Sequence, residues 1–212
     1  MNLFILSLNP EEIAKYMMDK HIAKIILEAV QMLCSAKRLI DVAGDSDGYD
    51  RLYKIAHKNH PVTIWCRAAQ ANFIWTLDLV DAMHAEWKYR YNHPDSKQHK
   101  SYSVAQYLRE NIPAPDKFEK EKLPNRMTPF ALAMPDENKV RNTPESPNNG
   151  DVSFDAVASY RSYYLSAPKR KIACWKKMRG MPEWYASGLK QLRKVESESS
   201  KYRYKTRLII IR

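Results

Sequence analysis

Apolar residues surround most of a helix that the pattern predicts at residues 19–35. Such a pattern indicates a helix that protein covers on nearly every side, because its side chains avoid water. We therefore expect this helix to lie deep in the core. Its apolar positions are Ile22, Ile26, Ala29, Val30 and Leu33.

Polar side chains recur along the same helix at spacings of three and four residues, so they form one narrow stripe. The stripe consists of His21, Lys24, Glu28, Gln31 and Ser35. A lone buried charge costs several kcal/mol or more, so these side chains must be paired or must face a wet cleft. The stripe therefore has two interpretations: a Glu–Lys or Glu–His pair inside a helical core, or part of an active site.

Caps and breakers predict where the other helices begin. Asn9 suits the N-cap and Pro10 the first helical position, and Pro61 marks another start in the same way. Ser103 is expected to cap a shorter helix, and the apolar run at residues 3–8 is expected to pack on the core as extended chain. The predicted helices span residues 10–40, 50–57, 61–91, 103–111 and 151–166, and a basic helix that carries Trp175 follows Pro168.

A second polar line is predicted on the long helix at residues 61–91. Its members are His60, Thr63, Arg67, Asp78 and Asp81. The two striped helices could face each other. Arg67 would then suit a carboxylate or a phosphate, because its guanidinium is a fixed fork of donors.

The stretch at residues 112–151 is rich in proline and polar residues. It is too long for a plain connection, so it is either a functional loop or a partly mobile arm. Within it, residues 127–135 are apolar enough to be ordered against the core.

Composition favours an all-α protein, since the 212 residues include 44% apolar residues and only five Gly. We expect a single compact helical domain at residues 1–196, with the Pro-rich loop inside it, and a basic tail at residues 197–212. Three Cys without a C-x-x-C pair argue for reduced thiols inside a cell. No signal peptide is evident, and no stretch of eighteen apolar residues predicts a membrane span.

The excess positive charge lies in the C-terminal part of the chain. Residues 169–212 hold 14 Lys or Arg and three acidic residues, whereas the first 168 residues hold 21 of each sign. Basic residues interleaved with Trp and Tyr are typical of a surface that binds a nucleic-acid backbone and its bases. A solvated or disordered basic tail is the alternative, above all for residues 197–212. Candidate nucleic-acid contacts are Arg67, Arg161, Lys169, Arg170, Lys171, Trp175, Lys176, Lys177, Arg179, Trp184 and Tyr185.

Three motifs together resemble a known family. They are Asp19-x-His21 followed by Glu28, the His60-Pro-Val-Thr-Ile-Trp start of the second long helix, and Pro182-x-Trp184-Tyr185 in a basic setting. This combination is similar to the phage pyrimidine-dimer DNA glycosylase/AP lyases of the endonuclease V type and to related phage and large-virus proteins. The resemblance implies a small all-helical protein that acts on double-stranded DNA.

The resemblance also implies roles for single residues. Glu28 would be the catalytic carboxylate, His60 and His21 residues of the site, and Trp184 and Tyr185 part of a DNA-contacting loop. The family's nucleophile is the α-amine of the first residue, and α-amines titrate near pH 7.7–8.0 in general. Here Asn2 is too large for ready removal of the initiator Met, so that amine would be Met1's own. Lys24, one turn from Glu28, is the alternative nucleophile.

No cofactor is predicted. His57 and His60 lack a second pair of ligands, so no metal site is predicted either. A Gly-rich phosphate loop is absent from the sequence, which argues against a nucleotide-fuelled enzyme. Two alternatives to a glycosylase stay open: a transferase that modifies a DNA base such as thymine, and a DNA-binding protein without catalysis. We expect a monomer in the cytoplasm, in the host cell if the protein is viral.

Overall fold

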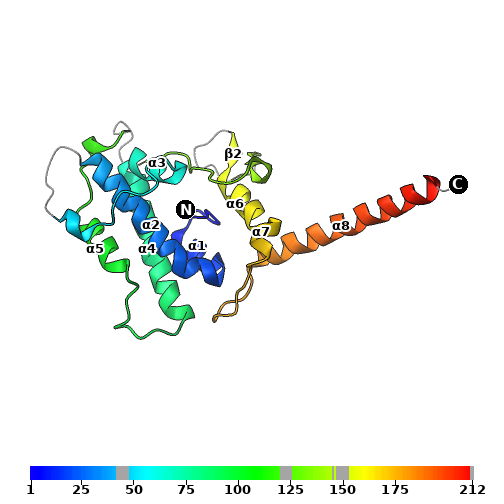
Figure 1. Ribbon diagram of the computed structural model, residues 1–212, viewed down its shortest axis with the longest axis horizontal. Coiled ribbons are helices and arrows are strands. Elements are labelled where there is room, and N and C mark those ends of the chain that lie inside the picture. Colours follow the sequence, from blue (N-terminus) through cyan, green and yellow to red (C-terminus); the bar gives the residue numbers. More distant parts are fainter. Residues whose placement is uncertain (42–47, 120–125, 145, 147–152, 211–212) are drawn as a thin grey trace. The chain divides into compact units, whose positions relative to one another are not determined.

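Helices dominate the computed structural model, which confirms the predicted all-α class (Figure 1). The structure describes residues 1–41, 48–119, 126–144, 146 and 153–210, with side chains described as far as residue 198. Two compact units, residues 1–179 and residues 180–212, make up the chain. The domain predicted at residues 1–196 and the tail at 197–212 stay predictions.

The first unit holds most of the helices and a small two-stranded sheet. Strands β1 (Val140–Arg141) and β2 (Phe154–Asp155) pair antiparallel, with Val140 opposite Asp155. The helices are α1 (Pro10–Tyr16), α2 (Asp19–Ile40), α3 (Pro61–Ala68), α4 (Gln70–Arg90), α5 (Tyr102–Glu110), α6 (Ala156–Leu165) and α7 (Ala167–Arg170), with short 3-10 helices η1 (Tyr49–Arg51), η2 (Pro115–Lys117) and η3 (Asp136–Asn138).

Helix α2 is the centre of the first unit. It packs against α3, α4 and α5, and α1 packs against α4 (Figure 1). All five apolar positions predicted for its core face are completely buried: Ile22, Ile26, Ala29, Val30 and Leu33. The predicted core position of this helix is therefore confirmed, and the two polar stripes do lie on helices that contact each other.

The predicted helix at residues 10–40 is in fact two helices. Met17 and Met18 adopt extended backbone conformations between α1 and α2. The buried guanidinium of Arg90 donates to the carbonyl oxygens of Ala14, Lys15 and Met17. These bonds satisfy the carbonyls at the end of α1, so the chain can leave the helix there without losing hydrogen bonds. Nothing in the local sequence signals this partner 73 residues away.

The predicted helix at residues 61–91 is also interrupted. Ala69 is extended, with φ −148° and ψ 147°, and separates α3 from α4. The side chain of Asn72 donates to the carbonyl of Trp65 and to Thr128, which satisfies the end of α3 from within the core. The predicted polar line is therefore divided, because His60 and Arg67 belong to α3 and its cap whereas Asp78 and Asp81 belong to α4.

Several shorter predictions need correction. In place of a helix at residues 50–57, the chain forms only η1 and then an irregular stretch. Ser103 lies inside α5 and does not cap it, whereas Asp155 caps α6 by accepting from the Ala158 N–H. The basic helix after Pro168 ends at Arg170, so Trp175 lies in the loop that follows it.

The described part of the Pro-rich loop packs on the core, as predicted for residues 127–135. The ring of Phe130 lies 5.1 Å from that of Trp65 and 4.9 Å from that of Trp75. The Thr128 hydroxyl accepts a hydrogen bond from Nδ2 of the buried Asn72, and the Thr128 N–H donates one to Asn72 Oδ1. This segment is therefore part of the first unit's core and passes close to the N-terminal run.

The second unit consists mainly of α8 (Glu183–Ile210). The resemblance implied that Trp184 and Tyr185 belong to a loop, but both lie in the first turn of this helix, where their rings are 5.6 Å apart. The helix begins here because Pro182 occupies a starting position and its carbonyl accepts from the N–H groups of Tyr185 and Ala186.

Candidate active site

The N-terminal run brings the start of the chain to the polar stripe of α2. Residues 3–6 are buried whereas Leu8 is exposed, so the predicted packing of residues 3–8 on the core is confirmed for residues 3–6 only. The run places the Asn2 N–H 3.0 Å from Glu28 Oε2, and the Met1 amine nitrogen lies 3.7 Å from the same oxygen. The amine at the start of the chain and a carboxylate in the middle of α2 therefore meet at one place.

Lys24 also contacts Glu28, one turn earlier on α2. Its Nζ lies 3.6 Å from Oε1, and its side chain is 72% exposed while that of Glu28 is 14% exposed. The Glu–Lys pair of the first interpretation therefore exists. The pair lies where α2 is partly open to solvent, and the other carboxylate oxygen, Oε2, faces the Met1 amine. This arrangement agrees with the second interpretation, in which the stripe is part of an active site.

His60 lies beside this pair and caps α3. Its Nδ1 accepts from the Val62 N–H at 3.2 Å, so a neutral His60 ring carries its proton on Nε2. Burial lowers the pKa of His60, and the positive charges of the N-terminal amine and His57 lower it further, while Glu28 acts in the opposite direction. His60 therefore lies within the electrostatic field of both predicted catalytic groups.

His21 is placed behind the site as a neutral, covered ring. Its Nδ1 lies 2.6 Å from the Tyr164 hydroxyl, and its ring stacks on Phe4 at 4.5 Å. Burial, with the nearby charges of Lys169 and Lys24, lowers the pKa of His21 to about 3. A ring of this kind supports the N-terminal run and is not available as a proton acceptor near neutral pH.

Lys169 reaches the same region from α7. Its Nζ lies 4.5 Å from the centre of the Phe4 ring and 5.0 Å from the centre of the Tyr163 ring. Burial lowers the pKa of Lys169, the charge of Glu28 raises it, and that of Lys24 lowers it. A half-buried cation held on two aromatic faces is a suitable partner for a phosphate.

Two other predicted nucleic-acid contacts bond within the protein. Arg161 Nε donates to the Leu6 carbonyl at 3.0 Å, which holds the N-terminal run from α6. Arg67 Nη1 donates to the Lys58 carbonyl, and Arg67 Nε lies 3.5 Å from the carboxylate of Glu119. Their contact with nucleic acid stays a prediction.

The basic loop at residues 171–179 is anchored within the first unit. Trp175 is buried and donates to the Tyr16 carbonyl, the Lys176 N–H donates to Asp19, and Arg179 binds Glu86 through two nitrogens at 2.8 and 2.9 Å. The anchors leave three lysines exposed: Lys171, Lys176 and Lys177. Arg170 and Trp184 are half-buried and Tyr185 is buried.

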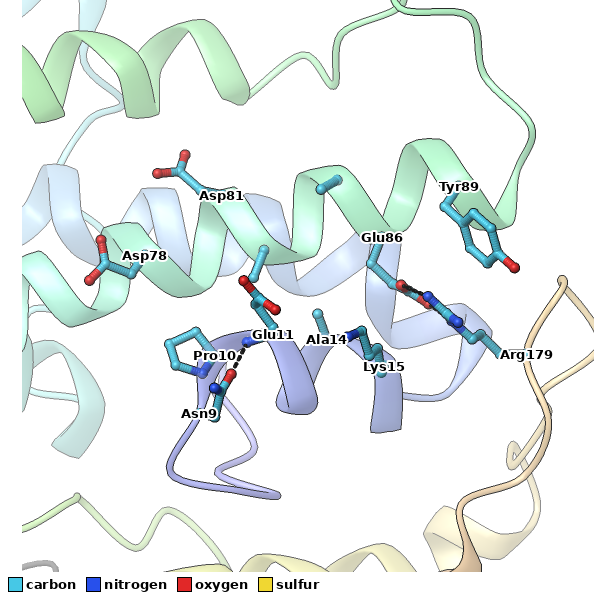
Figure 2. A pocket seen from close by; sticks show the side chains of 12 residues that line it. Asn9, Pro10, Glu11, Ala14, Lys15, Asp78, Asp81, Glu86, Tyr89 and Arg179 are labelled. Atoms are coloured by element: carbon cyan, nitrogen blue, oxygen red, sulfur yellow. Dashed lines mark hydrogen bonds and ion pairs between the residues drawn. The ribbon is translucent and has the colours of Figure 1, made fainter.

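A pocket of about 690 Å³ lies between α1 and α4 (Figure 2), and its lining does not include Glu28. Asp78 and Asp81 line one side, where Arg109 binds both carboxylates, and Glu86 with Arg179 lines another. Burial alone would raise the pKa of Glu86, but hydrogen bonds from Arg179 and Arg90 lower it. Arg179 is the one predicted site residue in this lining, so the pocket is separate from the predicted catalytic residues.

In the described part of the chain, no group of three His, Cys, Asp or Glu side chains is arranged to hold a metal ion. Within the same residues, no helix is long and apolar enough to cross a membrane. The positively charged groups that contact Glu28 are the Met1 amine and the Lys24 side chain.

Sequence reasoning missed two residues that shape this site. Asn2 binds Glu28 through its N–H, and Phe4, at φ +52°, lies in the left-handed region that non-glycine residues rarely adopt. A polar residue directly before a buried apolar run is a weak signal for the first. No pattern in the sequence signals the second.

These features define a class: an all-helical protein in which the first residue's amine and a half-buried carboxylate share one site. The model of the family described as pyrimidine dimer DNA glycosylase matches residues 1–99, slightly less than half of the 212-residue chain. The match confirms the resemblance over the segment that holds Met1, Lys24, Glu28 and His60, and it supports a glycosylase-type function in general. No curated protein and no solved structure matches the chain significantly.

Proposed function

We propose that the protein is a DNA N-glycosylase of the pyrimidine-dimer type with AP lyase activity, in which the Met1 amine is the nucleophile and Glu28 the catalytic carboxylate. The observation that carries the proposal is the 3.7 Å approach of the Met1 amine to Glu28 Oε2 in a half-buried site. The family match over residues 1–99 supports the general class and a DNA substrate.

In the first step, the unprotonated Met1 amine attacks the anomeric carbon of the damaged nucleotide. A bond forms between the amine nitrogen and C1′, and the bond between C1′ and the base breaks, so the base leaves with the bonding electrons. Positive charge develops on the sugar during this step. The carboxylate of Glu28, which is only 14% exposed, stabilises that charge more strongly than it would in bulk water.

In the lyase step, the bond between C1′ and the ring oxygen O4′ breaks, O4′ takes that electron pair and a proton lost by the nitrogen, and the nitrogen forms an imine with C1′ of the opened sugar. Glu28 takes a proton from C2′, the bond between C3′ and its oxygen breaks, and the 3′ phosphate leaves with that electron pair. Water then hydrolyses the imine and restores the amine. His60 and Lys24 lie close enough to influence these proton transfers electrostatically, and we assign them supporting roles.

DNA binding in this proposal uses the exposed lysines of the basic loop together with Lys169. Cations on one surface neutralise backbone phosphates, and an enzyme that reacts at C1′ must reach into the duplex by extruding a nucleotide or kinking the helix. We propose double-stranded DNA as the partner, and a monomer acting in the cytoplasm of the cell, or of the host cell if the protein is viral.

Borohydride trapping on a duplex with one abasic site tests the proposal. The reagent reduces an imine to a stable amine, so a lyase becomes covalently attached to DNA. We expect trapping by the wild-type chain and by Lys24→Met. A chain with several residues added before Met1 should give no adduct, because the amine then lies elsewhere.

Peptide mapping of the trapped adduct identifies the attached nitrogen directly. Attachment at Lys24 would reject the role of Met1 while keeping the lyase. No adduct, with tight DNA binding retained, would reject the lyase and favour the base-modifying transferase or the non-catalytic DNA-binding protein. Release of dimerised pyrimidine from irradiated duplex DNA separately tests the glycosylase step.

A further inference from the structure

We infer that Asn2 is a positioning residue, which fixes the Met1 amine beside Glu28 by binding the start of the chain to the carbonyl oxygen of Ala133. The inference rests on the proposed function, because it assigns a role in bringing the nucleophile to the reacting carbon. Ala133 lies outside the residues 1–99 that match the family model. A later part of the chain thus helps to build the site.

Asn2 makes four hydrogen bonds that serve this purpose. Its Nδ2 donates to the Ala133 carbonyl at 2.7 Å, and its Oδ1 accepts from the N–H groups of Leu3 at 2.9 Å and Phe4 at 3.3 Å. Its backbone N–H donates to Glu28 at 3.0 Å. Because the amide oxygen meets donors and the amide nitrogen meets a carbonyl, the orientation of the side chain is determined.

The side chain of Asn2 also holds the backbone in an uncommon turn. Phe4 has φ +52°, and one of the two bonds accepted by Asn2 Oδ1 comes from the Phe4 N–H. The Phe4 ring is held by His21 and Lys169. Residues 2–4 are therefore fixed as one piece, and the Met1 amine extends from it by a single residue.

Ala133 is a rigid anchor because a second buried residue holds its segment. The Ala133 N–H donates to the Tyr160 hydroxyl at 3.3 Å, and that hydroxyl donates to the Ala131 carbonyl at 2.7 Å. Tyr160 is completely buried on α6. The path of contacts runs from α6 through residues 131–133 to Asn2, and from Asn2 to Glu28.

Such a path matters for the rate because the amine is not fixed by Glu28 itself. The distance of 3.7 Å between the amine and the carboxylate is longer than a hydrogen bond, so the direction of the amine depends on how the buried Met1 side chain and the residue behind it, Asn2, are held. Misplacing a reacting group by about 1 Å can lower a rate roughly 100-fold.

Two substitutions at Asn2 test the role without changing the first residue. Asn2→Leu removes all the side-chain hydrogen bonds, and Asn2→Asp keeps the acceptor for Leu3 and Phe4 but loses the donor to Ala133. Both new side chains are large enough to retain the initiator Met, which an Ala or Ser at this position would not guarantee. Intact mass of each purified protein verifies that Met1 is present.

The measurement is single-turnover borohydride trapping at saturating abasic duplex, which yields a rate constant and an amplitude. We expect the rate constant to fall about 100-fold in both variants, with the amplitude and the DNA Kd unchanged within about twofold. A purely structural loss would lower the amplitude, which counts folded protein, and would leave the rate constant unchanged. Ser35→Ala is the matched control, because it removes a buried hydroxyl bonded to Gln31 and Ala56 on the same helix as Glu28.

Wild-type rate constants in both Asn2 variants would overturn the inference while leaving the proposed function intact. A wild-type chain that forms no adduct would overturn both. If the Asn2 variants do not fold, Tyr160→Phe removes only the hydroxyl that holds residues 131–133. It should lower the rate constant several-fold with the amplitude retained, and an unchanged rate constant there would also reject the positioning path.

Discussion

Two clusters of charged side chains in the first unit illustrate different uses of the same elements. Around Arg90, every donor is bound at short range. The guanidinium has five N–H groups, and it meets five acceptors at 2.6–3.2 Å: Glu86, Asp19 and the carbonyls of Ala14, Lys15 and Met17. Arg90 is buried and all its N–H groups are bonded, so its guanidinium has no donor left for a further partner.

Around Glu28, the charges stand further apart. Among the described residues, its carboxylate accepts from the Asn2 N–H at 3.0 Å, while the amines of Met1 and Lys24 lie at 3.7 and 3.6 Å. A carboxylate can accept about four hydrogen bonds, so capacity remains for a substrate. The comparison teaches that a closed cluster indicates a structural role, whereas a half-open cluster with separated charges is suited to chemistry.

Glu28→Gln should have the largest effect. Gln keeps the shape and the acceptor for Asn2 but loses the charge that, in the proposed mechanism, stabilises the transition state and accepts the C2′ proton. We expect the single-turnover rate of strand cleavage at an abasic site to fall by about 100- to 10,000-fold, the usual range for losing a general base. The melting temperature and the DNA Kd should change little, because the site is already partly open.

A Glu28→Gln variant with the wild-type rate would contradict the catalytic assignment. A large fall in melting temperature with the rate retained would show instead that Glu28 belongs to a closed pair like that of Arg90. Thermal unfolding and strand cleavage measured on the same preparation therefore distinguish a catalytic Glu28 from one that belongs to a closed structural pair.

Arg90→Met should act in the opposite way. The change leaves the carboxylates of Glu86 and Asp19 without their buried partner, which costs about 3–5 kcal/mol. For a protein of this size that corresponds to a fall in melting temperature of roughly 6–20 °C. The trapping rate constant of the protein that remains folded should stay near the wild-type value.

Lys88→Met is the matched control on the same helix. Lys88 pairs with Asp95, whose side chain is fully exposed, so this change should have little effect on the melting temperature, as is usual for a surface ion pair. Equal stabilities for the two variants would mean that the Arg90 cluster contributes no more than a surface pair.

The contrast between the clusters also explains what the sequence can predict. Glu86 with Arg90 and Lys24 with Glu28 are both acid–base pairs four residues apart on a helix, so their spacing looks alike. Periodicity correctly predicted the buried face of α2 and the all-α class, because both depend on local pattern. The break at Met17 depends on Arg90, 73 residues away, and the break at Ala69 on Asn72, whose side chain is bonded to Thr128, 56 residues away, so local pattern did not report them.

The candidate site was likewise predicted only where its residues belong to local sequence motifs. Glu28 and His60 were recognised from motifs, and the structure brings both close to Met1. The contribution of Asn2 and Ala133 was not predictable, because it depends on a contact between residues 131 positions apart. The concentration of positive charge at residues 171–179 was recognised from the sequence, but it was expected on a helix, and the anchors of the loop at Asp19 and Glu86 were not predicted.

The smallest effect is expected from replacing the exposed lysines of the basic loop, which is anchored to the cluster around Arg90. Asp19 and Glu86 bind both Arg90 and the basic loop, so in the proposed function the cluster would contribute to DNA binding only by holding that loop in place. Replacing Lys171, Lys176 and Lys177 together with Gln should leave the melting temperature unchanged, since all three are exposed. For each DNA phosphate that the variant no longer neutralises, the slope of log affinity against log salt should become shallower by about 0.9.

Replacing the exposed Lys97, Lys100 and Lys117 with Gln removes the same charge elsewhere and should leave the slope near the wild-type value. Equal slopes for the two triple variants would locate the DNA surface outside the basic loop, and the anchoring by Asp19 and Glu86 would then serve stability alone.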